Sequence, residues 1–177
     1  MSRAHVVVRQ VEVPSGSTIK VALKRTDFAD AYEVPLARPE LQVGEAYVAI
    51  FCNAPSWVQG LMNLRGYIAV CLGLTHPFDA RNVVPSDRQS FEIGQRVGSF
   101  TVQSIYANEL IVGDDDKHLN FRISTIKIER EGVFYITVST AVEIHNSLGH
   151  AYMFVVKPFH RFLAPYMLRR AAIGGRL

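Results

Sequence analysis

The feature that most constrains the fold is a series of β-rich runs over residues 100–145 that leads straight into a long apolar helical segment. The runs are rich in β-branched and aromatic residues, and only short groups of turn-forming residues separate them. Connections this short join antiparallel neighbours, because a parallel crossover needs about a dozen residues or more. The sequence therefore predicts an antiparallel meander of strands over residues 100–106, 109–113, 118–129 and 133–145.

The last two of these strands are expected to have one polar and one apolar face. If a tight turn at residues 130–132 joins them, Ile128 lies opposite Val133 and Arg122 lies opposite Ser139. The apolar face has to be covered, so we expect the C-terminal helix to pack on it. The polar face then holds His118, Asn120, Arg122, Ser124, Thr137, Ser139, Glu143 and His145, and the apolar face holds Leu119, Phe121, Ile123, Phe134, Ile136, Val138, Val142 and Ile144.

The segment from Leu148 onward is predicted to form that covering helix. Asn146 or Ser147 can cap its N-terminus, and apolar residues occupy most of its circumference. Pro158 and Pro165 each remove an intrahelical hydrogen bond, so we expect a kink or a break near each of them. The glycine-containing tail over residues 173–177 is expected to fray.

The N-terminal half adds strands and a helix pair. Residues 5–13 are predicted to form an arm or edge strand, residues 18–24 one or two helical turns, and residues 31–36 a short strand. Within that strand Pro35 marks either a sheet edge or the end of the ladder. Helical spacing of apolar residues predicts one helix over 43–51 and a second that starts at Pro55 and stops at Gly73.

Together these elements predict one α+β domain over residues 1–177. It consists of an N-terminal arm (1–26), a core (27–172) and the tail. The core is a curved antiparallel sheet packed against a long C-terminal helix, with two shorter helices after the first strand.

Composition and charge narrow the function classes. A chain of 177 residues with 49% hydrophobic and 20% charged residues is typical of a globular protein. The net charge is +3, but the positive charges are scattered, so we expect no nucleic-acid partner. No apolar run is long enough for a signal peptide or a membrane span, which predicts a cytoplasmic location. Cys52 and Cys71 are interpreted as reduced, buried residues, and no cofactor motif is present, so we expect neither a metal nor a cofactor.

The strongest candidate for chemistry is the segment from Gly113 to Arg122, where an acidic turn runs into a strand with a histidine and an arginine on one face. Cross-strand contact of His118 with Glu143 would orient the imidazole for acid–base work, with His145 as a second candidate. The alternative is a solvated turn followed by ordinary ion pairs on a wet sheet face.

Three further segments each admit two interpretations. Between Glu143 and His150 several polar side chains converge, either to bind an anion at the start of the helix or simply to cap it. The Lys157–Arg161 segment mixes cations with aromatic residues, as does a membrane-surface helix, but also as does a core helix with snorkelling cations. The loop over residues 75–90 is either a mobile lid or a plain surface loop.

Short motifs in a fixed order occur at residues 27–32, 54–58, 64–65, 113–122, 145–146 and 158–161. Together they resemble a bacterial domain-of-unknown-function family, number 2867, whose domain stands alone or follows a short-chain-dehydrogenase-like domain. The family is similar in turn to the helix-grip superfamily (SRPBCC) of polyketide cyclases and lipid-transfer domains. The resemblance implies a helix-grip-like fold with a cavity between sheet and closing helix, and it carries over no catalytic residue.

We expect from these observations a domain that binds a hydrophobic small molecule, such as a lipid, a polyketide or an aromatic metabolite. One alternative is a cyclase- or isomerase-type enzyme that uses His118 or His145 with Glu143 and Arg122. The other is an interaction or membrane-surface module that acts through the basic, aromatic C-terminal helix. The oligomeric state is left open. The expected cavity lining is Trp57, Phe121, Val138, Tyr152, Phe159 and Phe162.

Overall fold

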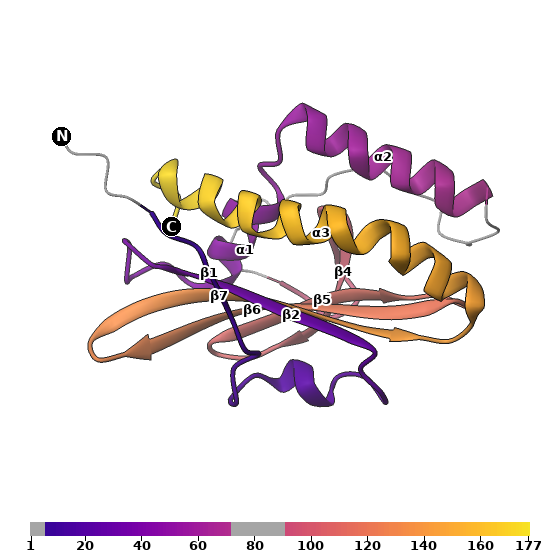
Figure 1. The fold of residues 1–177 in the computed structure, drawn as a ribbon. Helices are drawn as coiled ribbons and strands as arrows, with labels where there is room; N and C mark the ends of the chain where they lie inside the picture. The colour runs from indigo at the N-terminus through magenta and orange to yellow at the C-terminus, as the bar shows by residue number, and fades with distance from the viewer. Residues whose placement is uncertain (1–5, 72–90) are drawn as a thin grey trace.

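The computed structural model describes residues 6–71 and 91–177, without the side chains of residues 64, 65 and 68–71, and shows helices on one face of an antiparallel sheet (Figure 1). In this part of the chain, seven strands lie in the order β1-β2-β7-β6-β5-β4-β3. This confirms an α+β fold with a long C-terminal helix. The strands are β1 (Arg9–Val11), β2 (Phe28–Pro35), β3 (Arg96–Val97), β4 (Phe100–Ile105), β5 (Glu109–Asp115), β6 (Leu119–Arg130) and β7 (Val133–Ile144). The helices are η1 (Thr18–Val21, a 3₁₀ helix), α1 (Val43–Phe51), α2 (Ser56–Cys71) and α3 (Ser147–Ile173).

The predicted pairing of the last two strands is wrong by two residues. Val133 lies opposite Arg130, and Arg122 lies opposite Ala141. Residues Glu131 and Gly132 alone form the turn, and both have positive φ, of 53° and 77°, which is the conformation of a two-residue hairpin loop that follows the twist of the strands. Because side chains alternate with a period of two, a slip of two leaves every residue on its predicted face.

The helices cover the apolar face of the sheet. In Figure 1, α1 and α3 lie directly over the strands, and α2 lies on the same side. The buried core joins apolar residues of β2, β5, β6 and β7 to those of α1 and α3. Tyr47 of α1 is fully buried at its centre, where its hydroxyl donates a hydrogen bond to the carbonyl of Val97 at 3.0 Å. Burial raises the pKa of Tyr47 well above its usual value.

The N-terminal arm is fixed to the opposite face of the sheet. There the carboxylate of Glu109, only 2% exposed, accepts hydrogen bonds from the hydroxyls of Ser17, Thr18 and Ser124 and from the backbone N–H of Thr18. Ionised acceptors form strong hydrogen bonds, and this one is surrounded by donors. Figure 1 shows η1 below the sheet, on the side away from α3.

The first strands and helices lie where they were predicted, although β1 is shorter than the predicted 5–13 and β2 begins before the predicted 31–36. Pro35 is the last residue of β2, which confirms that it ends the ladder; β2 itself is not an edge strand, because β1 and β7 flank it. Helix α1 has the predicted limits, and Glu45 in its first turn accepts a hydrogen bond from the backbone N–H of Gln42. The two-residue strand β3 was not predicted. Gly73 and the loop over 75–90 lie outside the described residues.

Helix α3 is continuous, so of the kink or break predicted at each of its prolines the break is not found. Asn146 caps it by accepting a hydrogen bond from the N–H of Gly149 at 3.1 Å. Buried residues near both ends, including Met153 and Leu168, hold it on the sheet, so packing offsets the hydrogen bonds that the prolines remove. The tail does not fray either, because Leu177 is 1% exposed and belongs to the main core.

Candidate functional site

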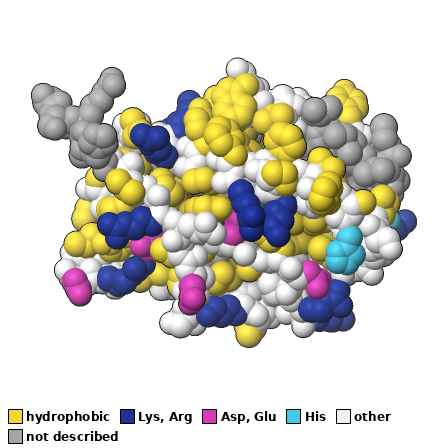
Figure 2. Space-filling model, in the orientation of Figure 1, with side chains coloured by type: hydrophobic (Ala, Val, Ile, Leu, Met, Phe, Trp, Pro, Cys, Tyr) yellow, Lys and Arg dark blue, Asp and Glu magenta, His cyan; other side chains and the backbone are white. Residues whose placement is uncertain are grey.

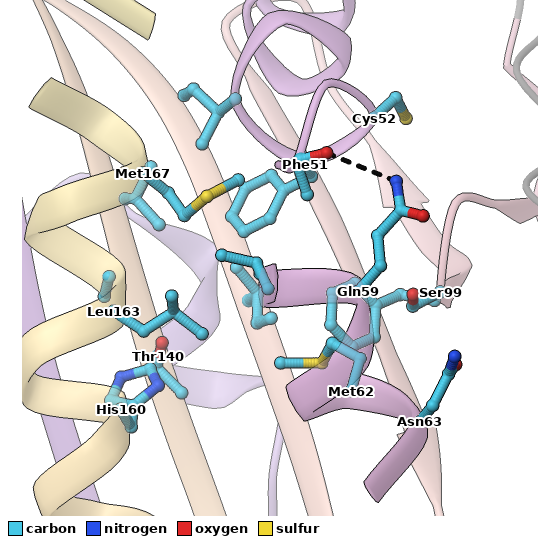
Figure 3. A pocket seen from close by; sticks show the side chains of 17 residues that line it. Phe51, Cys52, Gln59, Met62, Asn63, Ser99, Thr140, His160, Leu163 and Met167 are labelled. Atoms are coloured by element: carbon cyan, nitrogen blue, oxygen red, sulfur yellow. Dashed lines mark hydrogen bonds between the residues drawn. The ribbon is translucent and has the colours of Figure 1, made fainter. Parts of the chain in front are cut away.

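A pocket of about 210 Å³ lies between the sheet and the helices α1, α2 and α3 (Figure 3). Ile123 and Val138 form part of its floor on β6 and β7. Leu163, Ala164 and Met167 of α3 form one wall, and α1 and α2 supply the others, including Ile50, Phe51, Val58 and Met62. The lining is mainly apolar, so the pocket favours an apolar ligand body.

Polar side chains occur on two sides of this pocket. On the side of α2, Gln59 and Asn63 are exposed and lie near Ser99; the Gln59 amide donates a hydrogen bond to the carbonyl of Ala54 at 3.2 Å. On the side of α3, Figure 3 shows Thr140 and His160 close together. The pocket is therefore apolar in its body and polar at its margins.

His160 is paired with a buried carboxylate. Its Nε2 lies 3.0 Å from Oδ1 of Asp30, whose side chain is 3% exposed, whereas the His160 side chain is 23% exposed. Asp30 lies on β2 directly opposite Thr140 of β7, so the pair is anchored to the centre of the sheet. The ring of Phe28 packs edge-on against the imidazole, with centroids 6.0 Å apart. Burial, and next the charge of Asp30, raises the pKa of Tyr32 on the same strand.

The residues predicted to line the cavity have different positions. Val138 lines it, whereas Phe121 packs on Phe100 in the core and Tyr152 belongs to a second apolar cluster near the start of α3. Trp57, at 44% exposure, packs against Tyr166. Phe159 and Phe162 are 59% and 64% exposed, on the solvent side of α3.

His160 was not predicted to line the pocket, because in the sequence it stands among the cations of the Lys157–Arg161 segment. The available signal was its spacing from Met153, Ala164 and Met167, which places it on the buried stripe of the helix. Nothing in the local sequence pointed to Asp30, its partner 130 residues away.

The residues predicted for acid–base chemistry lie on the other face of the sheet. Arg122 is almost completely buried there and forms a two-pronged ion pair with Asp115, at 2.7 and 3.2 Å. Glu143 lies opposite Asn120, so the predicted cross-strand neighbourhood of His118 and Glu143 is wrong. The same two-residue slip explains this difference.

The polar segment before α3 acts as a cap. Nδ1 of His118 lies 3.1 Å from Oδ1 of Asn146, and the Asn146 amide donates to the carbonyl of Lys117 at 3.2 Å. His145 is exposed, and its backbone N–H donates a hydrogen bond to the carbonyl of His118. Capping thus accounts for Asn146, whose side chain also lies against His118.

The three consecutive aspartates point to different partners. Asp114 accepts a hydrogen bond from the Thr101 hydroxyl at 2.7 Å, Asp115 pairs with Arg122, and Asp116 accepts from the backbone N–H of His118. Within residues 6–71 and 91–177, no three His, Cys, Asp or Glu side chains are grouped as metal ligands. In the same part of the chain, no helix has the length and apolarity needed to cross a membrane.

A family model described as a protein of unknown function (DUF2867) matches residues 22–167. The match covers most of the chain, including all of β2 to β7, so the chain belongs to this family. Comparisons with curated proteins and with solved structures each gave no match.

Proposed function

We propose that this member of the DUF2867 family binds a hydrophobic small molecule in the pocket beneath α3. The observation that carries the proposal is the mainly apolar pocket itself, bounded by the sheet and by α1, α2 and α3 and partly open beside α2, where a domain of this size normally has a filled core. Unfilled apolar space costs stability, because the surrounding side chains lose contacts. A ligand that fills the space would restore those contacts.

We infer a helix-grip-like fold as the basis of this function. Two helices follow the strand β2, a meander from β3 to β7 comes next, and α3 closes the chain across the sheet. The last strand of the meander, β7, pairs with β2 and so joins the two parts of the sheet. This order supports the relationship, and in such an architecture the space under the closing helix is the natural ligand site.

The volume of the pocket bounds the size of the ligand. About 210 Å³ is larger than the engineered cavity of about 150 Å³ that holds benzene, and smaller than the roughly 300–1,000 Å³ of pockets for drug-sized compounds. A compound with one aromatic ring, or a short aliphatic chain, fits this range. A complete long-chain lipid does not.

Native mass spectrometry, followed by denaturing extraction, tests the proposal on the purified chain. We expect a small hydrophobic compound to accompany the protein, or added p-xylene to bind in a ligand-observed NMR titration. Ala164→Leu should weaken either form of binding, because its three added carbon atoms take up part of the pocket from the side of α3. Ala151→Leu makes the same change on the exposed side of the helix and should leave binding unchanged. Absence of both the bound compound and p-xylene binding would refute the proposal.

A second candidate function is supported by the solvent side of α3. Phe154, Val155, Phe159 and Phe162 are between 53% and 84% exposed there, an unusual density of large apolar side chains on a surface. The helix also carries Lys157, Arg161, Arg169 and Arg170 but no Asp or Glu. Figure 2 shows apolar and basic side chains mixed over the region of α2 and α3. We propose that this face rests on an anionic lipid surface.

Co-sedimentation with vesicles tests this second function. The chain should bind vesicles that contain phosphatidylserine, bind phosphatidylcholine vesicles less, and lose binding in the double variant Phe154→Ser/Phe162→Ser. Val21→Ser is the matched control, because Val21 is 82% exposed on η1, on the opposite side of the sheet. Equal loss in the control, or no binding by the wild type, would contradict a membrane role for α3.

A further inference from the structure

We propose that His160, held by Asp30, is the polar anchor of the pocket, and that the ligand is a small neutral aromatic or short aliphatic compound with one hydroxyl group. This inference rests on the proposed binding function and specifies the ligand class. It combines three observations: the pairing of His160 with Asp30, the burial of Asp30, and the position of His160 in the pocket wall.

The buried carboxylate is costly for the fold. Asp30 has a side chain that is 3% exposed, and its Oδ2 meets no donor at hydrogen-bond distance within the described residues, although the carboxylate also interacts with the Tyr32 side chain on the same strand. A buried charge with so few partners destabilises a protein unless other interactions offset the cost. A Ser or Asn at the same site could also tie α3 to β2, so holding the helix does not by itself explain an aspartate at this position.

The effect of Asp30 on His160 is to fix the orientation of the ring. When Nε2–H of the neutral imidazole donates a hydrogen bond to the carboxylate, the only acceptor of the ring is Nδ1. The described residues offer no hydrogen-bond partner to Nδ1, although the His160 ring forms part of the pocket lining. The imidazole can therefore serve a ligand group with Nδ1 while Asp30 holds it in place.

The chemistry of the pair selects the polar group of the ligand. A hydroxyl can donate to Nδ1 of the neutral ring and can accept from Nδ1–H of the protonated ring, so it suits both states. A carboxylate would bring a second negative charge close to the buried Asp30, which disfavours an acidic ligand. The hydroxyl of Thr140, which also lines this side of the pocket, offers a second polar contact.

A pair of nearly isosteric probes tests the anchor. p-Cresol and p-xylene differ by a hydroxyl in place of a methyl group, and both fit the size range of the pocket. We expect His160→Phe to weaken p-cresol binding about fivefold, the factor for one net hydrogen bond of about 1 kcal/mol. It should leave p-xylene binding within about twofold. His150→Phe, at an exposed position on the same helix, should change neither affinity.

A second measurement separates anchoring from a merely structural role. The ¹⁵N resonances of the His160 imidazole should shift when p-cresol binds and stay in place when p-xylene binds, and Asp30→Asn should reduce the shift. If both probes bind and His160→Phe weakens them equally or not at all, the anchor is refuted while the pocket stands. If neither probe binds to the wild type and no compound accompanies the purified chain, the proposed binding function itself fails.

Discussion

The sign of the stability change in the Ala164→Leu variant tests whether the space beneath α3 is unfilled. Leucine adds three carbon atoms to a side chain that lines the pocket. At about 0.8 kcal/mol for each buried carbon, the gain is at most about 2.4 kcal/mol. Fixing the leucine rotamer costs roughly 0.5–1 kcal/mol, and its slightly lower helix propensity a few tenths more. We therefore expect the unliganded protein to be stabilised by about 1 kcal/mol.

Urea unfolding measures this difference in stability. With an m-value of about 2 kcal/mol/M, the midpoint should rise by about 0.5 M. The control Ala151→Leu changes an exposed position of the same helix and should stay within about 0.5 kcal/mol of the wild type. If the site were already filled, overpacking would instead destabilise the protein by about 1–3 kcal/mol. A fall in the midpoint of that size would refute the cavity and the binding function that depends on it.

Substitutions at three further positions test how the scaffold is held together. Glu109→Ala should reduce the free energy of unfolding in urea by about 2–4 kcal/mol, because it leaves buried donors, including those of the N-terminal arm, without an acceptor. Glu109→Gln should reduce it less, since the amide oxygen still accepts hydrogen bonds. Gly149→Ala would gain up to about 1 kcal/mol from helix propensity. Its new Cβ would lie 2.3 Å from the carbonyl oxygen of His118, so we expect a net loss of stability. A rise in the urea midpoint would contradict this contact. The N–H of Ile144 at 2.7 Å, and then Arg25, hold the pKa of Asp27 below its usual value against the opposing effect of burial. The ionised Asp27 therefore stabilises the fold fully above the unfolded-state pKa of about 3.9, and this stabilisation is lost as pH falls through the lower folded-state pKa. Asp27→Asn should reduce the free energy of unfolding at pH 7 and flatten its decline in acid. An unchanged pH profile would argue against this.

The sequence by itself determined most of the elements of this fold and the buried faces of β6 and β7. The meander, the helix over 43–51 and the capped C-terminal helix follow from periodicity and turn chemistry, which act over a few residues. The faces of β6 and β7 were also predicted correctly, because alternation with a period of two survives a slip of two residues. The position of the covering helix followed from the need to bury the apolar face.

Only the tertiary structure decided which side chains meet. The exact register of β6 and β7 depended on a two-residue turn, and it separated His118 from Glu143. The rotation of α3 turned Phe159 and Phe162 to solvent and His160 toward the pocket. The pairing of His160 with Asp30 joins the first long strand to the last helix, and such a contact depends on the packing of the whole chain. Local propensity carries no information about it, because the two residues become neighbours only after the sheet and α3 have come together.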